Sequence, residues 1–209
     1  YFATQIGIPF IFAFIIGIIL TGLLGFVLER TFLRPMVGEP VFSVAVLTIG
    51  IDILLRVVLD NWIGINPKYM GDPFPSYGNF GSLNIGGLTV KYLEVTALIT
   101  SLILISILSV FFKRSKYGVA MRATSLDQEA ALAQGINVGR VFGLVWFIAG
   151  LLAAFAGFFI TGGFNTLTNT SFISALRALP AVVIGGLDSI TGAIIGSLII
   201  GLTQAYVGY

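Results

Sequence analysis

Long runs of apolar residues alternate with short polar segments along most of the chain. Four of these runs cover residues 3–28, 41–59, 93–112 and 141–161, and the first and fourth contain no charged side chain. An α-helix rises ~1.5 Å per residue, so about 20 residues cross the ~30 Å hydrocarbon core of a bilayer. Each run therefore predicts one membrane-spanning helix.

The last apolar stretch, residues 172–207, is too long for one span. It is interrupted by Arg177, by Pro180 and by the neighbouring Gly185 and Gly186. We predict a broken or re-entrant helix over residues 174–184, followed by a full-length helix over residues 190–207. Non-helical backbone at membrane depth is tolerated only where protein or a water-filled cavity surrounds it, so a break here indicates a nearby transport path. An ordinary tight turn between two helices is the alternative that the sequence leaves open.

Composition supports the membrane assignment. Hydrophobic residues make up 57% of the 209 residues and charged residues only 10%, whereas a soluble domain has about 25% charged residues. The absence of cysteine and histidine excludes disulfides, thiolate or imidazole metal sites and histidine-based catalysis on this chain. The basic residues lie in short loops rather than on one soluble face, so no nucleic-acid partner is expected. We predict an all-α, polytopic transmembrane helix bundle that forms a single domain over residues 1–209.

The basic residues also predict the orientation of the bundle. The loop over residues 113–140 has five Lys or Arg residues, whereas the long loop over residues 60–91, which is rich in Gly and Pro, has only Lys68 and Lys91. By the positive-inside rule, the first of these loops is cytoplasmic and the second is outside. The chain starts without a methionine and without the features of a secretory signal, and we expect further helices to precede it.

A short helix is predicted within the cytoplasmic loop. Asp127 or Ser125 can cap its free amide groups, and the alanines from Ala130 onward favour helix. Gly135 is placed to end the helix in a left-handed conformation. On composition alone, a solvated connection is the simpler interpretation of this helix, and docking of a cytoplasmic partner is the alternative.

Several motifs, and the order in which they follow along the chain, favour the docking of a cytoplasmic partner. They are residues 118–136 in this loop, Arg34-Pro35 and residues 47–50 upstream, and residues 147–157 and 179–196 downstream. Together they resemble the permease subunits of the branched-chain amino acid ABC transporter family, and the resemblance covers essentially the whole chain. Each motif alone is weak, but their shared order, with apolar helices between them, is specific.

The resemblance implies a function and a set of partners. A permease of this family works with a second homologous permease, two cytoplasmic ATPase subunits and an extracytoplasmic substrate-binding protein, in the inner membrane of a bacterium or archaeon. Its cytoplasmic coupling helix fits a cleft on the ATPase. The positions here that match the family's loop are Arg122, Ala123, Asp127, Glu129, Ala130, Ala133, Gly135 and Ile136. Family members are longer than this chain. The resemblance implies that the N-terminal helices of the family are missing from it.

No nucleotide-binding motif is present. A P-loop needs Gly-Lys followed by Ser or Thr, and the sequence contains no Gly-Lys dipeptide. We therefore expect no cofactor on this chain and ATP bound by the partner subunits.

Charged residues within the second span are candidates for the substrate pathway. Asp52 and Arg56 are four residues apart with the acid first, which favours an ion pair on one helix face. A pair that only neutralises itself is the simpler interpretation, and a cavity-facing pair near the substrate is the alternative. For Arg177, snorkelling to headgroups is the simpler account, and attraction of a substrate carboxylate is the other. Thr48, Gly185 and Gly186 are further candidates.

Two other function classes remain as alternatives. An ion- or proton-coupled secondary transporter of small polar solutes would use the Asp52 and Arg56 pair as a relay. A membrane-embedded enzyme has no support, since the chain has no paired carboxylates, histidine cluster or nucleophile motif.

Overall fold

The computed structural model describes residues 9–37, 39–64, 66, 68–69, 82–85, 88–164, 166–167, 176, 178–186 and 189–207. The chain divides into two compact units, Tyr1–Thr166 and Leu167–Tyr209, and each is described by itself below. Within the described residues, five helices are long and apolar enough to cross a membrane. The predicted all-α, multi-pass architecture is therefore confirmed.

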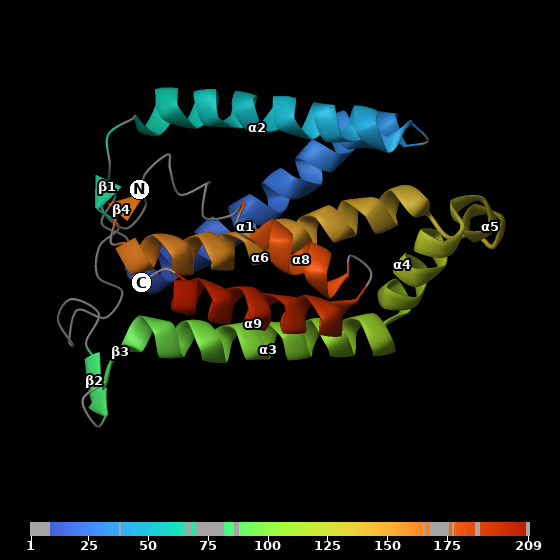
Figure 1. Cartoon of the computed structure of the whole chain (residues 1–209). Coiled ribbons are helices and arrows are strands. Elements are labelled where there is room, and N and C mark those ends of the chain that lie inside the picture. The colour runs from blue at the N-terminus through green and yellow to red at the C-terminus, as the bar shows by residue number, and fades with distance from the viewer. Residues whose placement is uncertain are drawn as a thin grey trace. The chain divides into compact units, whose positions relative to one another are not determined.

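The five long helices match the predicted apolar runs (Figure 1). They are α1 (Phe10–Leu28), α2 (Val41–Ile63), α3 (Tyr92–Arg114), α6 (Val138–Phe164) and α9 (Ile190–Val207). Pro9 and Pro40 directly precede α1 and α2, where proline can start a helix but could not continue one. The predicted first span began at residue 3, and its first six residues lie outside the described part of the chain.

Shorter elements lie between the long helices. The strands β1 (Lys68–Tyr69) and β4 (Thr166–Leu167) have two residues each. The strands β2 (Ser82–Ile85) and β3 (Leu88–Lys91) form an antiparallel hairpin in which Ser82 pairs with Lys91 and Ile85 with Leu88. The hairpin leads directly into the start of α3.

Helices α1 and α6 pack against each other through small residues. A side chain at Gly22 would come within 2.7 Å of Leu151, and one at Gly150 would meet the carbonyl oxygen of Thr21 at 2.5 Å. Phe14 of α1 fills the space further along the contact, with its ring 4.6 Å from that of Phe158. Lipid provides no hydrophobic drive between helices, so close backbone approach and van der Waals packing hold such a pair together.

The predicted cytoplasmic loop contains two helices rather than one. Helix α4 (Lys116–Leu126) precedes α5 (Gln128–Ala133), and only α5 was predicted. The hydroxyl of Ser115 caps α4 by accepting a hydrogen bond of 2.9 Å from the amide of Gly118. Gly118 lies directly against the carbonyl groups of Phe111 and Phe112, so the missing side chain allows α4 to turn sharply away from α3.

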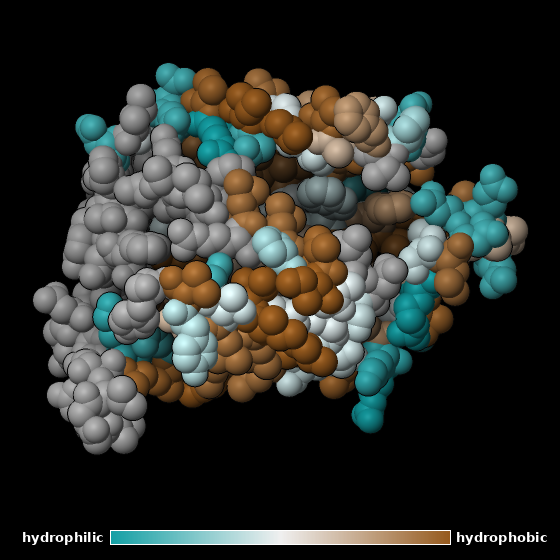
Figure 2. Space-filling model, viewed as in Figure 1, coloured by the Kyte–Doolittle hydropathy of each residue, from teal (hydrophilic) through white to brown (hydrophobic). Residues whose placement is uncertain are grey.

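The hydropathy of the surface differs between the long helices and the loop that contains α4 and α5. Figure 2 shows hydrophobic colour over the described helices, with hydrophilic residues gathered around α4 and α5. Large aliphatic side chains on α2 and α3, such as Ile53, Val57 and Leu102, are more than half exposed in this single chain. An apolar surface of this extent is expected where lipid or other membrane helices are the surroundings.

The second unit contains the predicted break. Helix α8 (Ala178–Gly185) has eight residues, which gives a length of about 12 Å, less than half of the ~30 Å hydrocarbon core. Gly186 follows with φ of 88°, a conformation that glycine adopts without strain. The full-length helix α9 then begins at Ile190 and ends at Val207. A short helix followed by a complete span is present as predicted, and this order fits both a broken helix and the alternative of a tight turn between two helices. Residues 174, 175, 177, 187 and 188 lie outside the described part.

Glycines hold α8 close to α9. A side chain at Gly196 would strike the carbonyl oxygen of Ala181, and side chains at Gly185 and Gly192 would strike each other's backbone. Gly192 and Gly196 thus form a packing contact within this unit.

We therefore expect Gly196→Ala to separate α8 from α9 and to cost about 1–3 kcal/mol, because an added methyl group overpacks a backbone contact. The measurement is thermal unfolding of the purified protein in detergent. Gly201→Ala is the matched control on the same helix, since nothing lies within 4 Å of the position of its side chain. Equal unfolding temperatures for the two variants would contradict the packing role of Gly196.

Candidate functional site

Helix α5 is closed at both ends by its own hydrogen bonds. The carboxylate of Asp127 accepts from the amides of Glu129 and Ala130 at 2.9 and 3.0 Å. At the other end, Ile136 N–H donates to the carbonyl of Ala131 and Gly135 N–H to that of Leu132, which is the Schellman arrangement. Gly135 has φ of 81°, as its predicted role required. Of the two predicted caps, Asp127 is the one used, because the Ser125 hydroxyl donates back to the carbonyl of Arg122.

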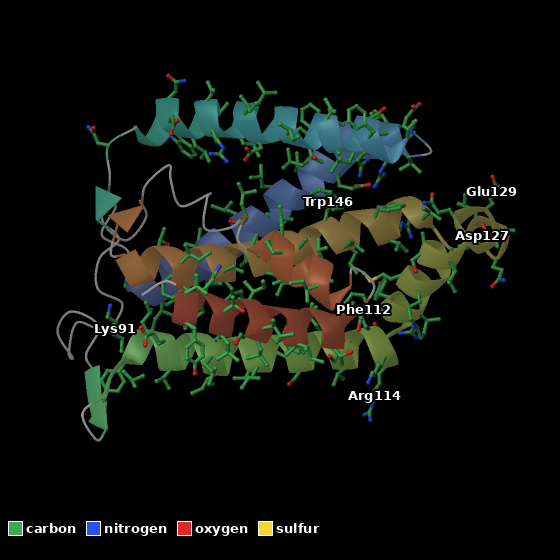
Figure 3. The ribbon with its side chains drawn as sticks, viewed as in Figure 1. Lys91, Phe112, Arg114, Asp127, Glu129 and Trp146 are labelled. Carbon is green, nitrogen blue, oxygen red and sulfur yellow. The ribbon has the colours of Figure 1, made fainter. Side chains whose placement is uncertain are left out.

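One face of α5 is turned inward and the rest is exposed. Ala131 is buried, whereas Ala130 and Ala133 are exposed. Figure 3 shows Asp127 and Glu129 at α5, beyond the end of the long helices. Two apolar side chains here were not predicted as contacts: Leu126 is 88% exposed and Leu132 is 57% exposed. The signal in the sequence that could have identified Leu126 and Leu132 is that both are leucines in an otherwise polar loop, next to or within the predicted helix.

The remaining loop positions are less accessible. Arg122 is exposed, but its guanidinium donates to the carbonyl oxygen of Phe112 and so ties α4 to the end of α3. Ala123 and Ile136 are half-buried. Of the predicted coupling residues, those from Asp127 to Gly135 are therefore grouped on one exposed element, and Arg122, Ala123 and Ile136 support it.

A polar stripe runs along one side of α2. Thr48, Asp52 and Arg56 follow at intervals of four residues and are half-buried, while the side chains of Ile49, Ile53 and Val57 are exposed. The stripe therefore coincides with the less exposed side of the helix. A side of this kind can line a protein contact or a water-filled path, because charges at membrane depth seldom face lipid.

The predicted ion pair in this stripe is present. Arg56 Nε lies 3.0 Å from Asp52 Oδ2, and Arg56 Nη2 lies 3.3 Å from Asp52 Oδ1. The arginine side chain is 34% exposed and the aspartate side chain 43%. Thr48 donates to the carbonyl of Ala45 within its own helix. A paired charge of this kind remains accessible from outside the chain.

The other pathway candidates lie elsewhere. Gly185 and Gly186 are at the end of α8, in the second unit. Arg177 lies outside the described residues. The structure thus groups Thr48, Asp52 and Arg56 on α2 in the first unit. Gly185 and Gly186 belong to the second unit.

A second ion pair was not anticipated. The helical path of α1 continues through a π-helical turn (Glu29–Leu33) and a 3-10 turn (Arg34–Met36). Arg34 Nε and Nη2 lie 3.1 and 3.0 Å from the two carboxylate oxygens of Glu29, which is only 1% exposed. Both residues belong to the polar run after the first span, and their spacing of five residues matches a π turn rather than an α turn.

Comparison with known proteins adds the family. The family model described as "Branched-chain amino acid transport system / permease component" matches residues 1–209. The chain belongs to this family. It is a family of transport permeases, in agreement with the membrane-spanning architecture described above.

Individual permeases of the family share moderate identity with the chain. The high-affinity branched-chain amino acid transport system permease protein BraD of Pseudomonas aeruginosa is 27% identical over 93% of this chain and 64% of its own length. The corresponding permease LivH of Salmonella typhimurium is 30% identical, over 92% of this chain and 63% of its own length. The ribose import permease RbsC of Bacillus subtilis is 34% identical over a shorter region, 63% of this chain and 43% of its own length.

The chain thus spans somewhat less than two thirds of the length of BraD and LivH. No solved structure shows a significant match to the chain.

For this permease-family chain, the α2 pair leads to a prediction. If Asp52 and Arg56 only neutralise each other, Asp52→Asn removes the negative charge of the pair from the span, where an unbalanced charge costs ~2.5–3.5 kcal/mol on membrane-insertion scales, so less folded protein should accumulate. Asp52→Asn combined with Arg56→Gln should restore the amount. Folded protein is measured by size-exclusion chromatography and transport by uptake into vesicles. Normal folding of both variants without uptake would instead assign the pair to substrate contact.

Proposed function

We propose that the chain is the transmembrane permease subunit of an ATP-driven ABC importer for branched-chain or related amino acids. It forms part of the substrate pathway in a bacterial or archaeal inner membrane. Its partners are a second homologous permease, two cytoplasmic ATPase subunits and an extracytoplasmic substrate-binding protein. The family assignment and the similarity to BraD and LivH over more than 90% of this chain support the amino-acid substrate, whereas the sugar permease is similar over a shorter region.

The observation on which the proposal rests is the form of α5. It is a six-residue helix whose amides and carbonyls are capped from within, so it does not need the membrane helices to complete its hydrogen bonds. Its exposed alanines allow a partner to approach closely, and the exposed Leu126 and Leu132 offer apolar contact area. The buried core of a protein interface is more apolar than its rim, so these two leucines would lie in the core of the contact.

Two features support a substrate pathway. The stripe of Thr48, Asp52 and Arg56 places polar groups along a span, and the break at Gly185 and Gly186 leaves helix ends inside an apolar segment. Helix ends and polar side chains at membrane depth provide the hydrogen-bonding groups that a polar substrate needs during crossing. ATP would bind to the partners, in keeping with the absence of a Gly-Lys dipeptide.

A second candidate function is a secondary transporter coupled to an ion or proton gradient. The accessible Asp52 and Arg56 pair is the observation that favours it, because ionisable residues within spans can relay protons. The two functions differ in their energy source. Uptake that continues after an ionophore collapses the gradient, and that stops without the ATPase subunits, supports the importer.

The importer proposal is tested at Ala130. Ala130→Trp places a large ring on the exposed face of α5 and should exclude the ATPase, while the membrane helices remain folded. A clash that costs about 1.4 kcal/mol lowers the association constant about tenfold. The measurements are co-purification of the ATPase with the permease and uptake of tritiated leucine by proteoliposomes that contain the assembled transporter.

Ala130→Ser is the matched control, because serine keeps the side chain small and should bind the ATPase normally. If Ala130→Trp protein binds the ATPase and couples hydrolysis to uptake as the control does, α5 is only a connector.

A further inference from the structure

At the end of α1, one side chain makes directed hydrogen bonds to the start of α6. Besides holding the carboxylate of Glu29, Arg34 Nη2 donates to the carbonyl oxygen of Gly139 at 2.8 Å, across 105 residues of sequence. A guanidinium can do this because its donors lie in one rigid plane. Arg34 therefore contacts both helices through directed hydrogen bonds.

The geometry of this contact depends on the π turn. Arg34 N–H donates to the carbonyl of Glu29, so one wide turn stacks residue 34 over residue 29. An α-helical turn would bring residue 33 to that position instead. The turn thus directs the guanidinium back over the buried carboxylate and toward α6.

The facing side of α6 consists of glycine where the contact is made. A side chain at Gly139 would lie 3.3 Å from the central carbon of the Arg34 guanidinium. One at Gly143 would lie 2.7 Å from the ring of Phe26 and 3.3 Å from Glu29 Oε2. Both positions leave room for the ion pair, and neither glycine has a positive φ in the described backbone.

The same end of α6 is tied to α5. The Ile136 amide donates to Ala131 of α5, and the side chain of Asn137 then accepts from the amide of Arg140 at 3.0 Å. Hydrogen bonds therefore connect α5 to the turn and the turn to Arg140 in the first turn of α6. The connection between α5 and α6 is thus short and hydrogen-bonded.

A cavity of about 210 Å³ lies beside the contact. Its lining includes Glu29 and Leu33 at the end of α1, Val44 of α2, Gln128 of α5, and Phe142 and Trp146 of α6. The cavity leaves α5 and the start of α2 without direct packing between their lining residues, whereas α1 and α6 are in close contact from Gly22 to Gly25 and from Trp146 to Leu151.

We propose that Arg34 is a positioning residue that makes α1 and α6 move as one body when the ATPase displaces α5. This proposal rests on the proposed function, because it assumes that α5 receives the motion. Arg34 touches neither substrate nor ATPase in this account. Packing holds the rest of the α1 and α6 contact together, and Arg34 supplies the directed hydrogen bonds at the end nearest α5.

The test compares Arg34→Lys with Arg30→Lys in the assembled transporter. Lysine keeps the positive charge beside Glu29 but lacks the planar fork, so it cannot hold both carboxylate oxygens and the Gly139 carbonyl together. Arg30 is the matched control, an exposed arginine in the same turn. The quantity measured is tritiated leucine taken up per ATP hydrolysed in proteoliposomes, together with the amount of ATPase that co-purifies.

For Arg34→Lys we expect normal co-purification and a decrease of about fivefold or more in uptake per ATP, the lower end of typical coupling effects. Arg30→Lys should leave both quantities unchanged. Gly139→Ala provides a second, milder route to the same loss, since its methyl group would lie 3.3 Å from the central guanidinium carbon and shifts the arginine by a few tenths of an ångström, while the charges of Glu29 and Arg34 remain. The double variant should be no worse than Arg34→Lys alone, because the two changes weaken one contact.

The proposal is overturned if uptake per ATP in Arg34→Lys and Gly139→Ala equals that of Arg30→Lys, or if both variants lose the ATPase and so act on docking. If Arg34→Lys does not fold, Gly139→Ala decides alone. A different result would contradict the proposed function, namely that Ala130→Trp protein couples ATP hydrolysis to uptake normally. An uncoupled Ala130→Trp with coupled Arg34→Lys and Gly139→Ala rejects only the role of Arg34.

Discussion

A polar group at membrane depth must find its hydrogen bonds inside the protein, because hydrocarbon offers none. The described residues meet this constraint with two ion pairs, one within α2 and one at the end of α1. The pair on α2 is partly exposed and lies on the polar stripe of that helix. In the second pair the Glu29 carboxylate is buried while the Arg34 side chain is 37% exposed, and a third hydrogen bond from Arg34 reaches α6. Glycines at the facing positions of α6 allow this approach, just as glycines allow α8 to lie against α9.

The sequence was sufficient to predict the elements that have a local signal, such as a long apolar run or a capping residue. The long helices and the capped α5 follow from apolar run length, Asp127 and Gly135, because these signals are local. Helix α4 was missed because its polar run, which includes Gly118, has no clear apolar period, and its start depends on contact with the end of α3. The contact between Arg34 and Gly139 could not be predicted, since it joins residues 105 positions apart and depends on a π turn for which the sequence gives no reliable signal.

These features suggest how the binding of a partner at α5 could change the proposed substrate pathway within the membrane. Helix α5 is rigid and exposed, and its hydrogen bonds continue into α6. The Arg34 contact then joins α6 to α1, while α2, with its polar stripe, is separated from them in part by the cavity. In this account α2 changes its position relative to the α1 and α6 pair, and the polar stripe changes its surroundings. Under the proposed function, the energy would come from the ATPase and the chain would supply the mechanical connection.

The central claim, that α5 is the surface where the ATPase docks, can be tested by site-directed cross-linking. The chain has no cysteine, so a single cysteine can carry a photoreactive label at Leu132 on α5 or at Leu98 on α3, which are 57% and 63% exposed. In the purified transporter, we predict a covalent adduct with the ATPase from residue 132 and none from residue 98. An ATPase adduct from neither position, or equal adducts from both, would contradict the account.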